Sequence, residues 1–408
     1  MLFIYNLLIQ IAGFFLKIVA LFIPKIKLFV DGRKDVFEDL LNKINYQDKT
    51  IWFHVASLGE YEQGLPVIEK IKIKYPNHKI VLTFFSPSGF EVRKNNKMAD
   101  ITTYLPLDTN SNVKNFLEIV HPEMVFFIKY EYWPNYLKEL RKRKIKTYLV
   151  SGIFRKQHIF FKWYGSFFSN ALKSFDYFFV QNDSSKLLLQ FIGFNNVKVS
   201  GDTRFDRVTS ILERNNSINS IEEFKNKQTT IVIGSSWSKD EDLILNYINQ
   251  SNNVKFIIAP HNINEIQILN LKSKIQKAVS LYSEKDNLEL SEFNVLIIDS
   301  IGILTKIYSY ADIAYVGGGF GKPGIHNILE PATFGVPIVI GPNFLNFAEA
   351  VALVNLQGCI TISNQQELNE AFDILILNED IRQEKGHICS TFVNMNKGAT
   401  DMIIKHLE

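Results

Sequence analysis

The sequence predicts an α/β protein with two doubly wound, Rossmann-like halves behind an apolar N-terminal helix. Short apolar runs alternate with amphipathic stretches along most of the chain, which is the βαβ rhythm of parallel sheets. This rhythm stops at a polar stretch, residues 209–228, and then starts again. The chain has 408 residues, of which 46% are hydrophobic. A chain of this length and composition can form about two to three domains.

Composition excludes some classes of function. The formal net charge of +3 is too small to favour a nucleic-acid-binding protein. Cys359 and Cys389 are the only cysteines in the sequence, so neither a disulfide framework nor a cysteine-rich metal site is available. This cysteine usage suits a reducing compartment.

Residues 1–24 are strongly apolar, with polar interruptions at Asn6, Gln10 and Lys17. About 20 apolar residues can span a bilayer, while the interruptions also suit a helix that lies in the membrane interface. Basic residues follow at 25–34, so the positive-inside rule keeps the rest of the chain in the cytoplasm. We expect a membrane anchor, spanning or interfacial, rather than a buried core helix.

The first half, residues 25–208, places two carboxylates just after predicted strands. Glu60 ends the stretch A-S-L-G-E, and Glu131 lies in K-Y-E-Y-W-P-N. Open α/β sheets bind ligands at the carboxyl ends of their strands. Glu60 is either a charge that favours the helix macrodipole or a base that takes a proton from a hydroxyl. The predicted strands are residues 51–55, 80–84, 125–128, 147–150 and 177–180.

The second half, residues 229–382, opens with a strand and the stretch S-S-W-S-K-D-E-D. Ser235 or Ser236 is predicted as a helix N-cap, and Asp240 favours the first helical turn. Residues 383–408 are predicted as a closing helix. The predicted strands are residues 230–234, 255–259, 295–299, 313–316 and 337–340.

The most informative stretch is the glycine-rich loop within residues 315–342, Y-V-G-G-G-F-G-K-P-G-I-H-N-I-L-E-P. Glycines let backbone N–H groups approach an anion, and a helix start adds its dipole. His326 and Asn327 supply hydrogen bonds, and Glu330 can accept one from a sugar hydroxyl. The loop therefore predicts a nucleotide site rather than a mobile turn. It is neither a P-loop nor a dinucleotide fingerprint, which argues against a dehydrogenase.

Four motifs occur in order along the chain: H-V-A-S-L-G-E (54–60), E-Y-W-P-N (131–135), S-G-D-T-R-F-D (200–206) and G-I-H-N-I-L-E-P (324–331). Together they resemble those of the 3-deoxy-D-manno-octulosonic acid (Kdo) transferases, the inner-membrane glycosyltransferases of lipopolysaccharide assembly. The resemblance covers nearly the whole chain. It implies a GT-B fold, in which two Rossmann-like domains face a cleft. It also implies transfer of Kdo from CMP-Kdo to a lipid A precursor, with inversion and without a metal or other cofactor.

The same resemblance assigns residues. Glu60 is similar to the general base that deprotonates the acceptor hydroxyl, and Glu131 to a second essential acid. The candidate substrate-binding residues are Ser57, Gly59, Arg155, Ser235, Ser236, His261, Gly318, Gly319, His326, Asn327 and Glu330.

The chain departs from the family pattern at two places. The usual A-P-R-H is A-P-H-N at residues 259–262, so His261 stands where an arginine is expected. It replaces that arginine only weakly, because an imidazole can be neutral at pH 7. The usual S-T-H is S-S-W-S.

Two other functions fit the same pattern. One is a different GT-B enzyme, such as another lipid-linked glycosyltransferase or a nucleotide-sugar epimerase. The other is a membrane-tethered nucleotide-binding protein without catalysis. The expected partners of a Kdo transferase are CMP-Kdo, a lipid A precursor and the membrane surface, with no nucleic acid. Its expected location is the inner membrane, with the catalytic domains on the cytoplasmic side.

Overall fold

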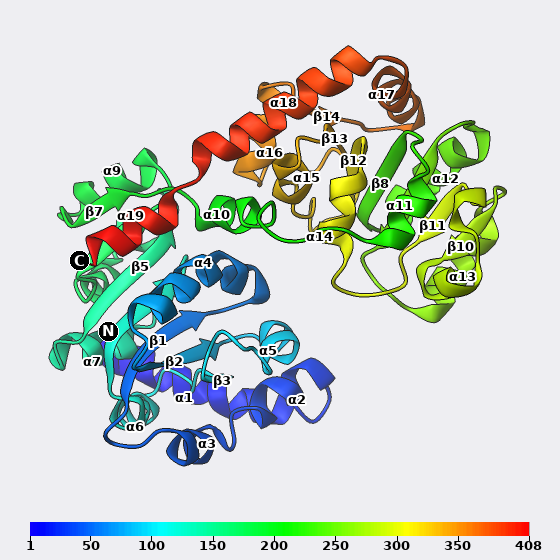
Figure 1. The fold of residues 1–408 in the computed structure, drawn as a ribbon. Helices are drawn as coiled ribbons and strands as arrows, with labels where there is room; N and C mark the ends of the chain where they lie inside the picture. The colour runs from blue at the N-terminus through cyan, green and yellow to red at the C-terminus, as the bar shows by residue number, and fades with distance from the viewer. Residues whose placement is uncertain (408) are drawn as a thin grey trace. The chain divides into compact units, whose positions relative to one another are not determined.

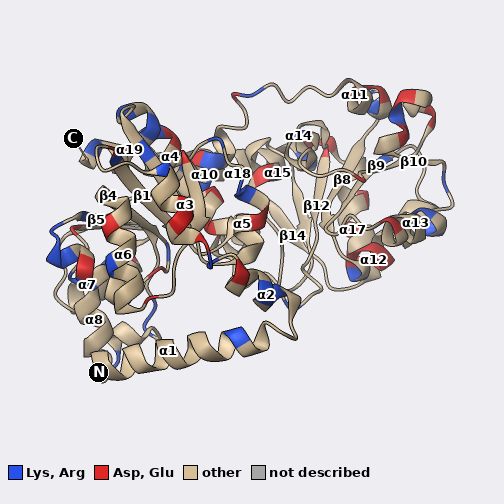
Figure 2. Ribbon diagram, turned by 90° about the horizontal axis from the view of Figure 1, so that it is seen from below, with Lys and Arg blue, Asp and Glu red and all other residues tan. Residues whose placement is uncertain are grey.

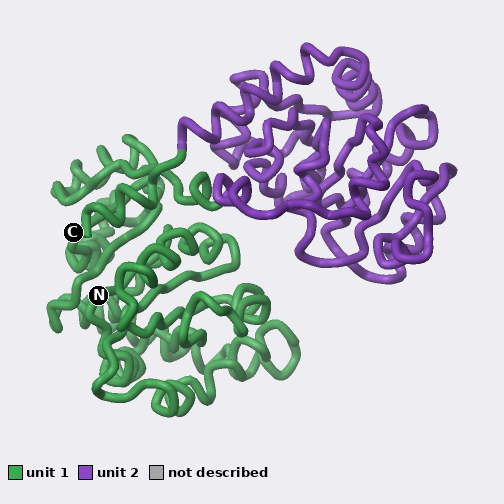
Figure 3. Tube along the Cα trace, viewed as in Figure 1, with its two compact units in different colours: residues 1–207, 397–408 green, residues 208–396 purple. Residues whose placement is uncertain are grey.

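The computed structural model describes residues 1–407 and divides into two compact units (Figure 3). Unit 1 holds Met1–Arg207 and the C-terminal segment from Lys397, and unit 2 holds Val208–Asn396. Each unit contains a seven-stranded sheet in which every strand pair is parallel (Figure 1). The prediction of two Rossmann-like α/β halves is confirmed.

The sheet of unit 1 has the strand order β3-β2-β1-β4-β5-β6-β7. The central strands β1 and β4 pair directly, and the winding of the chain reverses between them. The strands are β1 (Lys49–Val55), β2 (His78–Phe84), β3 (Ile101–Tyr104), β4 (Pro122–Ile128), β5 (Lys146–Gly152), β6 (Tyr177–Val180) and β7 (Val197–Val199). The helices are α1 (Leu2–Val19), α2 (Pro24–Asp31), α3 (Val36–Lys43), α4 (Leu58–Lys74), α5 (Pro87–Arg93), α6 (Asn110–Val120), α7 (Pro134–Lys142), α8 (Ser166–Leu172), α9 (Asp183–Phe191), α10 (Thr203–Thr209) and α19 (Ala399–His406).

Strand β1 forms the centre of the unit 1 core because six of its seven residues are buried. The Trp52 ring packs edge-on against Phe116 and Phe127 on one face of the sheet. On the other face, Phe53 stacks on Phe126 with ring centroids 4.7 Å apart. A strand covered on both faces reads as a nearly continuous apolar run, so a polar residue within it is unusual. Thr50 and His54 are the buried polar residues of β1, and His54 is the ionisable one.

Helix α1 contains no buried residue, so it is not a core helix. Lys17 is its one charged residue, and Figure 2 draws the rest of the α1 ribbon without charge colours. Among the residues that the structure describes, it is the one helix long and apolar enough to cross a membrane. Two polar contacts attach it to unit 1: the Tyr5 hydroxyl donates to Asp108 Oδ2 at 2.7 Å, and Asn135 Nδ2 donates to Asn6 Oδ1 at 2.7 Å.

The sheet of unit 2 has the order β10-β11-β9-β8-β12-β13-β14, with β8 and β12 paired at its centre. The strands are β8 (Thr230–Ser236), β9 (Lys255–Pro260), β10 (Val279–Leu281), β11 (Val295–Ile297), β12 (Ile313–Val316), β13 (Ile338–Ile340) and β14 (Cys359–Thr361). The helices are α11 (Asn219–Lys225), α12 (Ser238–Gln250), α13 (Glu265–Lys274), α14 (Leu304–Ile307), α15 (Leu329–Thr333), α16 (Ala348–Asn355), α17 (Gln365–Leu377) and α18 (Glu379–Asn396).

Two segments differ from the sequence-based expectation. The polar stretch 209–228 includes helix α11, because Ile221 and Phe224 are buried in the unit 2 core. The single closing helix predicted for residues 383–408 is instead two helices, α18 and α19, separated at Gly398, whose φ is +107°. Asp206 fixes the start of α19, since its carboxylate accepts hydrogen bonds from the backbone N–H groups of Gly398 and Thr400.

Candidate active site

Glu60 lies in the first turn of α4, directly after β1. Its Oε2 accepts a hydrogen bond from the backbone N–H of Ala56 at 2.5 Å, so it does help to satisfy the helix start. Burial raises the pKa of Glu60 to about 7, and the neighbouring charge of Glu131 adds to this shift. A carboxyl group whose pKa lies near 7 is suited to general base catalysis at neutral pH. Both sequence-based readings of Glu60 are therefore compatible with its geometry.

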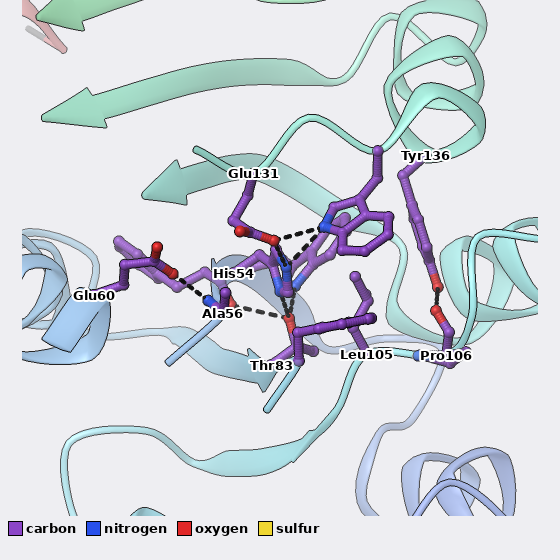
Figure 4. A network of polar contacts seen from close by, with 12 residues as sticks. His54, Ala56, Glu60, Thr83, Leu105, Pro106, Glu131 and Tyr136 are labelled. Carbon is purple, nitrogen blue, oxygen red and sulfur yellow. Dashed lines mark hydrogen bonds and ion pairs between the residues drawn. The ribbon is translucent and has the colours of Figure 1, made fainter. Parts of the chain in front are cut away.

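Glu131 is buried and follows β4. Its Oε2 accepts a hydrogen bond from Trp133 Nε1 at 2.7 Å and lies 2.9 Å from His54 Nε2. The other ring nitrogen of His54 lies 2.9 Å from Thr83 Oγ1. Figure 4 shows His54 between Glu131 and Thr83. This network joins β2, β1 and the loop after β4, so it fixes the position of the Glu131 carboxylate.

The two carboxylates occupy the topological switch point of unit 1. Strands β1 and β4 are neighbours, and each carboxylate follows the carboxyl end of one of them. This is the place where open α/β sheets bind ligands. The structure thus brings together Glu60 and Glu131, the two predicted catalytic residues.

The other candidates in unit 1 surround this edge of the sheet. Arg155 is exposed after β5 and lies near Tyr130. Burial raises the pKa of Tyr130 and Arg155 opposes this shift, while the charge of Glu60 raises it further. Ser57 is the N-cap residue of α4, although its side chain makes no capping hydrogen bond. Gly59 is exposed, with open space where a Cβ would lie.

The glycine-rich loop of unit 2 follows β12, and close packing explains its glycines. A Cβ on Gly319 would lie 2.6 Å from Gly341 Cα, so only glycine fits without a backbone shift. Gly318 has a φ of +95°, a conformation that other residues rarely adopt. Its N–H donates to Asp240 Oδ2 at 2.9 Å. Because Tyr315 Oη also donates to Asp240, at 2.8 Å, this buried carboxylate attaches α12 to the loop.

Three aromatic rings meet beside this loop. The Trp237 indole stacks on His261 with centroids 4.5 Å apart, and His261 lies 4.4 Å from His326. Trp237 Nε1 donates to His326 Nε2 at 3.0 Å. Burial lowers the pKa of His326 to about 4, with His261 adding to the shift, and burial also lowers the pKa of His261. Both imidazoles are therefore neutral at pH 7, so His261 does not supply the charge of the expected arginine.

Asn327 and Glu330 lie at the start of the short helix α15. Asn327 Nδ2 donates to Glu330 Oε1 at 3.1 Å. Thr305 Oγ1 donates to Glu330 Oε2 at 2.8 Å. These two contacts hold the Glu330 carboxylate in place.

The predicted N-cap at Ser235 or Ser236 is wrong, because β8 continues through Ser236 and α12 begins only at Ser238. The N-cap residue is Trp237, whose backbone N–H donates to Asp240 Oδ2 at 2.9 Å. The Asp240 carboxylate, in the first turn of α12, thus accepts the backbone N–H of the N-cap residue. Ser236 is buried and donates through Oγ to Glu241, while Ser235 has a φ of +54°.

Comparison with known proteins shows similarity to Kdo transferases over most of the chain. Residues 34–207 match the family described as 3-Deoxy-D-manno-octulosonic-acid transferase (kdotransferase). The chain is 24% identical to the 3-deoxy-D-manno-octulosonic acid transferase of Haemophilus influenzae, over 88% of this chain and 86% of that protein. It is 27% identical to the transferase of the same name from Aquifex aeolicus, over 82% of this chain and 88% of that protein.

These matches support a Kdo transferase. The named relatives make the chain a glycosyltransferase, and its carboxylate pair lies within the matched residues 34–207. Among solved structures, it is similar to UDP-GlcNAc 2-epimerase from Neisseria meningitidis, with a TM-score of 0.60, 16% identity, and coverage of 88% of this chain and 99% of that chain. A glycosyltransferase from Rickettsia africae gives a TM-score of 0.56 at 17% identity, covering 89% of this chain and 97% of that chain. These likenesses show a GT-B fold.

Sequence reasoning missed the residues that support the site. His54 belongs to the first Kdo transferase motif, and its signal was a single ionisable side chain inside an apolar strand. Asp240 was assigned only to the helix dipole, although it binds the glycine loop. Across residues 1–407, no three or more His, Cys, Asp or Glu side chains form a group that could hold a metal ion.

Proposed function

We propose that the protein transfers Kdo from CMP-Kdo to a lipid A precursor of the lipid IVA type, with inversion at the anomeric carbon, in lipopolysaccharide core assembly. Similarity to named Kdo transferases supports Kdo as the transferred sugar. The observation that carries the mechanism is the raised pKa of Glu60, about 7, at the switch point beside Glu131.

In this mechanism the acceptor hydroxyl oxygen attacks the anomeric carbon of Kdo from the face opposite the phosphate. The new carbon–oxygen bond forms as the bond to the CMP phosphate breaks, and CMP leaves with that electron pair. Glu60 takes the hydroxyl proton, which its raised pKa favours. Glu131 stays beside it, held by Trp133 and His54, and its negative charge makes Glu60 a stronger base.

On the donor side, the leaving phosphate gains negative charge as the bond breaks. We propose that His326 and Asn327 donate hydrogen bonds to it and that Glu330 accepts from the ribose hydroxyls. Neutral donors that are fixed in place can stabilise such charge without rearrangement. The mechanism includes no metal-dependent step and no cofactor beyond the donor substrate.

The acceptor is a membrane lipid, so we propose that α1 attaches the enzyme to the inner membrane, with both units on the cytoplasmic side. The helix exposes most of its large apolar side chains. Lysines at residues 25, 27 and 34 follow it and suit anionic lipid headgroups.

The test is to incubate the purified protein with CMP-Kdo and a tetra-acylated lipid A precursor and to analyse the products by mass spectrometry. The expected result is an acceptor heavier by one or more Kdo units, with release of an equal number of CMP molecules. Transfer from a UDP-sugar but not from CMP-Kdo would contradict the proposal and favour another glycosyltransferase. Conversion of UDP-GlcNAc without an acceptor would favour an epimerase. Binding of CMP without any product would favour a non-catalytic protein.

A further inference from the structure

The contact between Trp237 and His326 determines which nitrogen of His326 carries its proton. An indole N–H can donate a hydrogen bond but cannot accept one. Trp237 Nε1 lies 3.0 Å from His326 Nε2, so Nε2 must be the acceptor and must lack a hydrogen. A neutral imidazole carries one proton, and that proton is therefore on Nδ1.

The surroundings of His326 keep the ring neutral and oriented. Burial and the neighbouring His261 disfavour the imidazolium form. The Trp237 and His261 rings stack with nearly parallel planes, at an interplanar angle of 17°, and the tilt between His261 and His326 is 34°. The backbone N–H of His326 donates a hydrogen bond to the Gly317 carbonyl oxygen at 3.1 Å. In residues 1–407, no protein group accepts a hydrogen bond from Nδ1. The Nδ1–H is thus a fixed donor with capacity for a ligand.

We propose that Trp237 is a positioning residue, which holds His326 in the Nδ1–H tautomer so that this N–H donates to a phosphate oxygen of the bound nucleotide. The assignment of a nucleotide phosphate rests on the function proposed above. The tautomer itself does not, because it follows from the contact within unit 2. Trp237 touches no reacting atom in this role and acts only through His326.

The tautomer can be measured directly by ¹⁵N NMR of the full chain labelled in histidine, at pH 7 and without ligand. The expected spectrum gives His326 as the Nδ1–H tautomer, assigned by its loss in His326→Asn. In Trp237→Phe the ring stack remains but the indole donor is absent, so the His326 signals should shift towards a tautomer mixture. Trp163→Phe is the matched control, because Trp163 is 94% exposed in unit 1. It should leave the His326 signals unchanged.

Binding of CMP tests the consequence. Trp237→Phe should weaken CMP binding about fivefold, which corresponds to the loss of one hydrogen bond. His326→Asn keeps an amide N–H near the Nδ1 position in a group that has no tautomers. In that background Trp237→Phe should weaken CMP binding by less than twofold, since the two residues act as one unit.

The outcomes separate this inference from the proposed function. An Nε2–H tautomer in the wild type would overturn the inference, whether or not the protein transfers Kdo, and it needs no variant to fold. The inference would also be overturned if Trp237→Phe weakened CMP binding equally in the wild type and in the His326→Asn variant. A wild type with the Nδ1–H tautomer and tight CMP binding but no Kdo transfer would leave the inference standing and contradict only the proposed function.

Discussion

The switch points of the two units have the same topology and opposite chemistry. In unit 1, the loops after β1 and β4 present two carboxylates, Glu60 and Glu131. In unit 2, the loop after β12 presents the neutral His326 imidazole and closely packed glycines. A parallel sheet therefore determines where a site lies, while the loop residues determine whether it accepts a proton or donates hydrogen bonds.

The two sites also use their buried carboxylates differently. Glu131 lies beside a second carboxylate and raises its pKa. The Asp240 carboxylate instead accepts hydrogen bonds from Tyr315, Gly318 and Trp237. Glu131 thus makes Glu60 a stronger base, while Asp240 holds the glycine-rich loop in place. Substitutions at each switch point should therefore affect different measurable quantities.

The largest expected effect is that of Glu60→Gln. Glutamine cannot take the acceptor proton, so the kcat for Kdo transfer should fall by about 10²- to 10⁴-fold. CMP affinity should be unchanged, because the predicted CMP contacts lie in unit 2. The measurements are steady-state transfer by mass spectrometry and CMP titration calorimetry.

Glu69→Gln is the control for this substitution, since Glu69 lies on the same helix, α4. It should retain wild-type activity. Unchanged transfer in Glu60→Gln would show that Glu60 is only a helix-start residue.

Gly319→Ala should have the next largest effect, and it should act through binding. The added Cβ would lie 2.6 Å from Gly341 Cα, so the loop backbone must move. CMP affinity should fall by more than tenfold, about 1.4 kcal/mol or more. Gly59→Ala is the comparison in unit 1, where a Cβ meets nothing within 4 Å. It should leave the melting temperature and CMP affinity unchanged, and a loss of CMP affinity equal to that of Gly319→Ala would contradict the distinction between the two loops.

His54→Phe should affect stability and catalysis together. It removes the partner of Glu131 and Thr83 in a buried network, which should cost about 1–3 kcal/mol of unfolding free energy. A Glu131 carboxylate without this contact should also change the pH dependence of kcat/KM. The measurements are urea unfolding and a pH–rate profile. A variant with wild-type stability and an unshifted profile would mean that His54 neither supports nor positions Glu131.

The central strands were predictable from sequence, and the edge strands were not. Every strand inside the two sheets matches a predicted apolar run within a few residues. The strands that were missed are the four sheet edges, β3, β7, β10 and β14. They are only three or four residues long, and most carry partly exposed positions, so they lack a long apolar run.

The site residues were also predictable only where a local sequence pattern marks them. Glu60 and Glu131 were found because each follows a predicted strand, which is a local pattern. His54 and Asp240 act through residues far along the chain: Thr83 is 29 positions from His54, and Gly318 is 78 positions from Asp240. No local pattern carries such pairings, since only the tertiary fold creates them. The resemblance to a family supplied roles for the motif residues but not for these supports.

The smallest expected effect concerns pH and tests the electrostatics of unit 1 alone. The pKa of Glu60 is raised from an ordinary 4.5 to about 7 in the folded protein. Its stabilising contribution is therefore fully present below pH 4.5 and is lost as the pH rises through 7. Glu60→Gln removes this titration, so its stability relative to wild type should increase between pH 5 and pH 8. The expected increase is about 1–2 kcal/mol, below the roughly 3 kcal/mol of the full shift, because the group is partly solvated. The measurement is the melting temperature of both proteins across that range, with Glu69→Gln as a control whose offset from wild type stays constant. If the Glu60→Gln offset were equally constant with pH, the Glu60 carboxylate would titrate as it does in the unfolded chain. Glu131 would then not prepare Glu60 as a base, and the contrast between the roles of Glu131 and Asp240 would be lost.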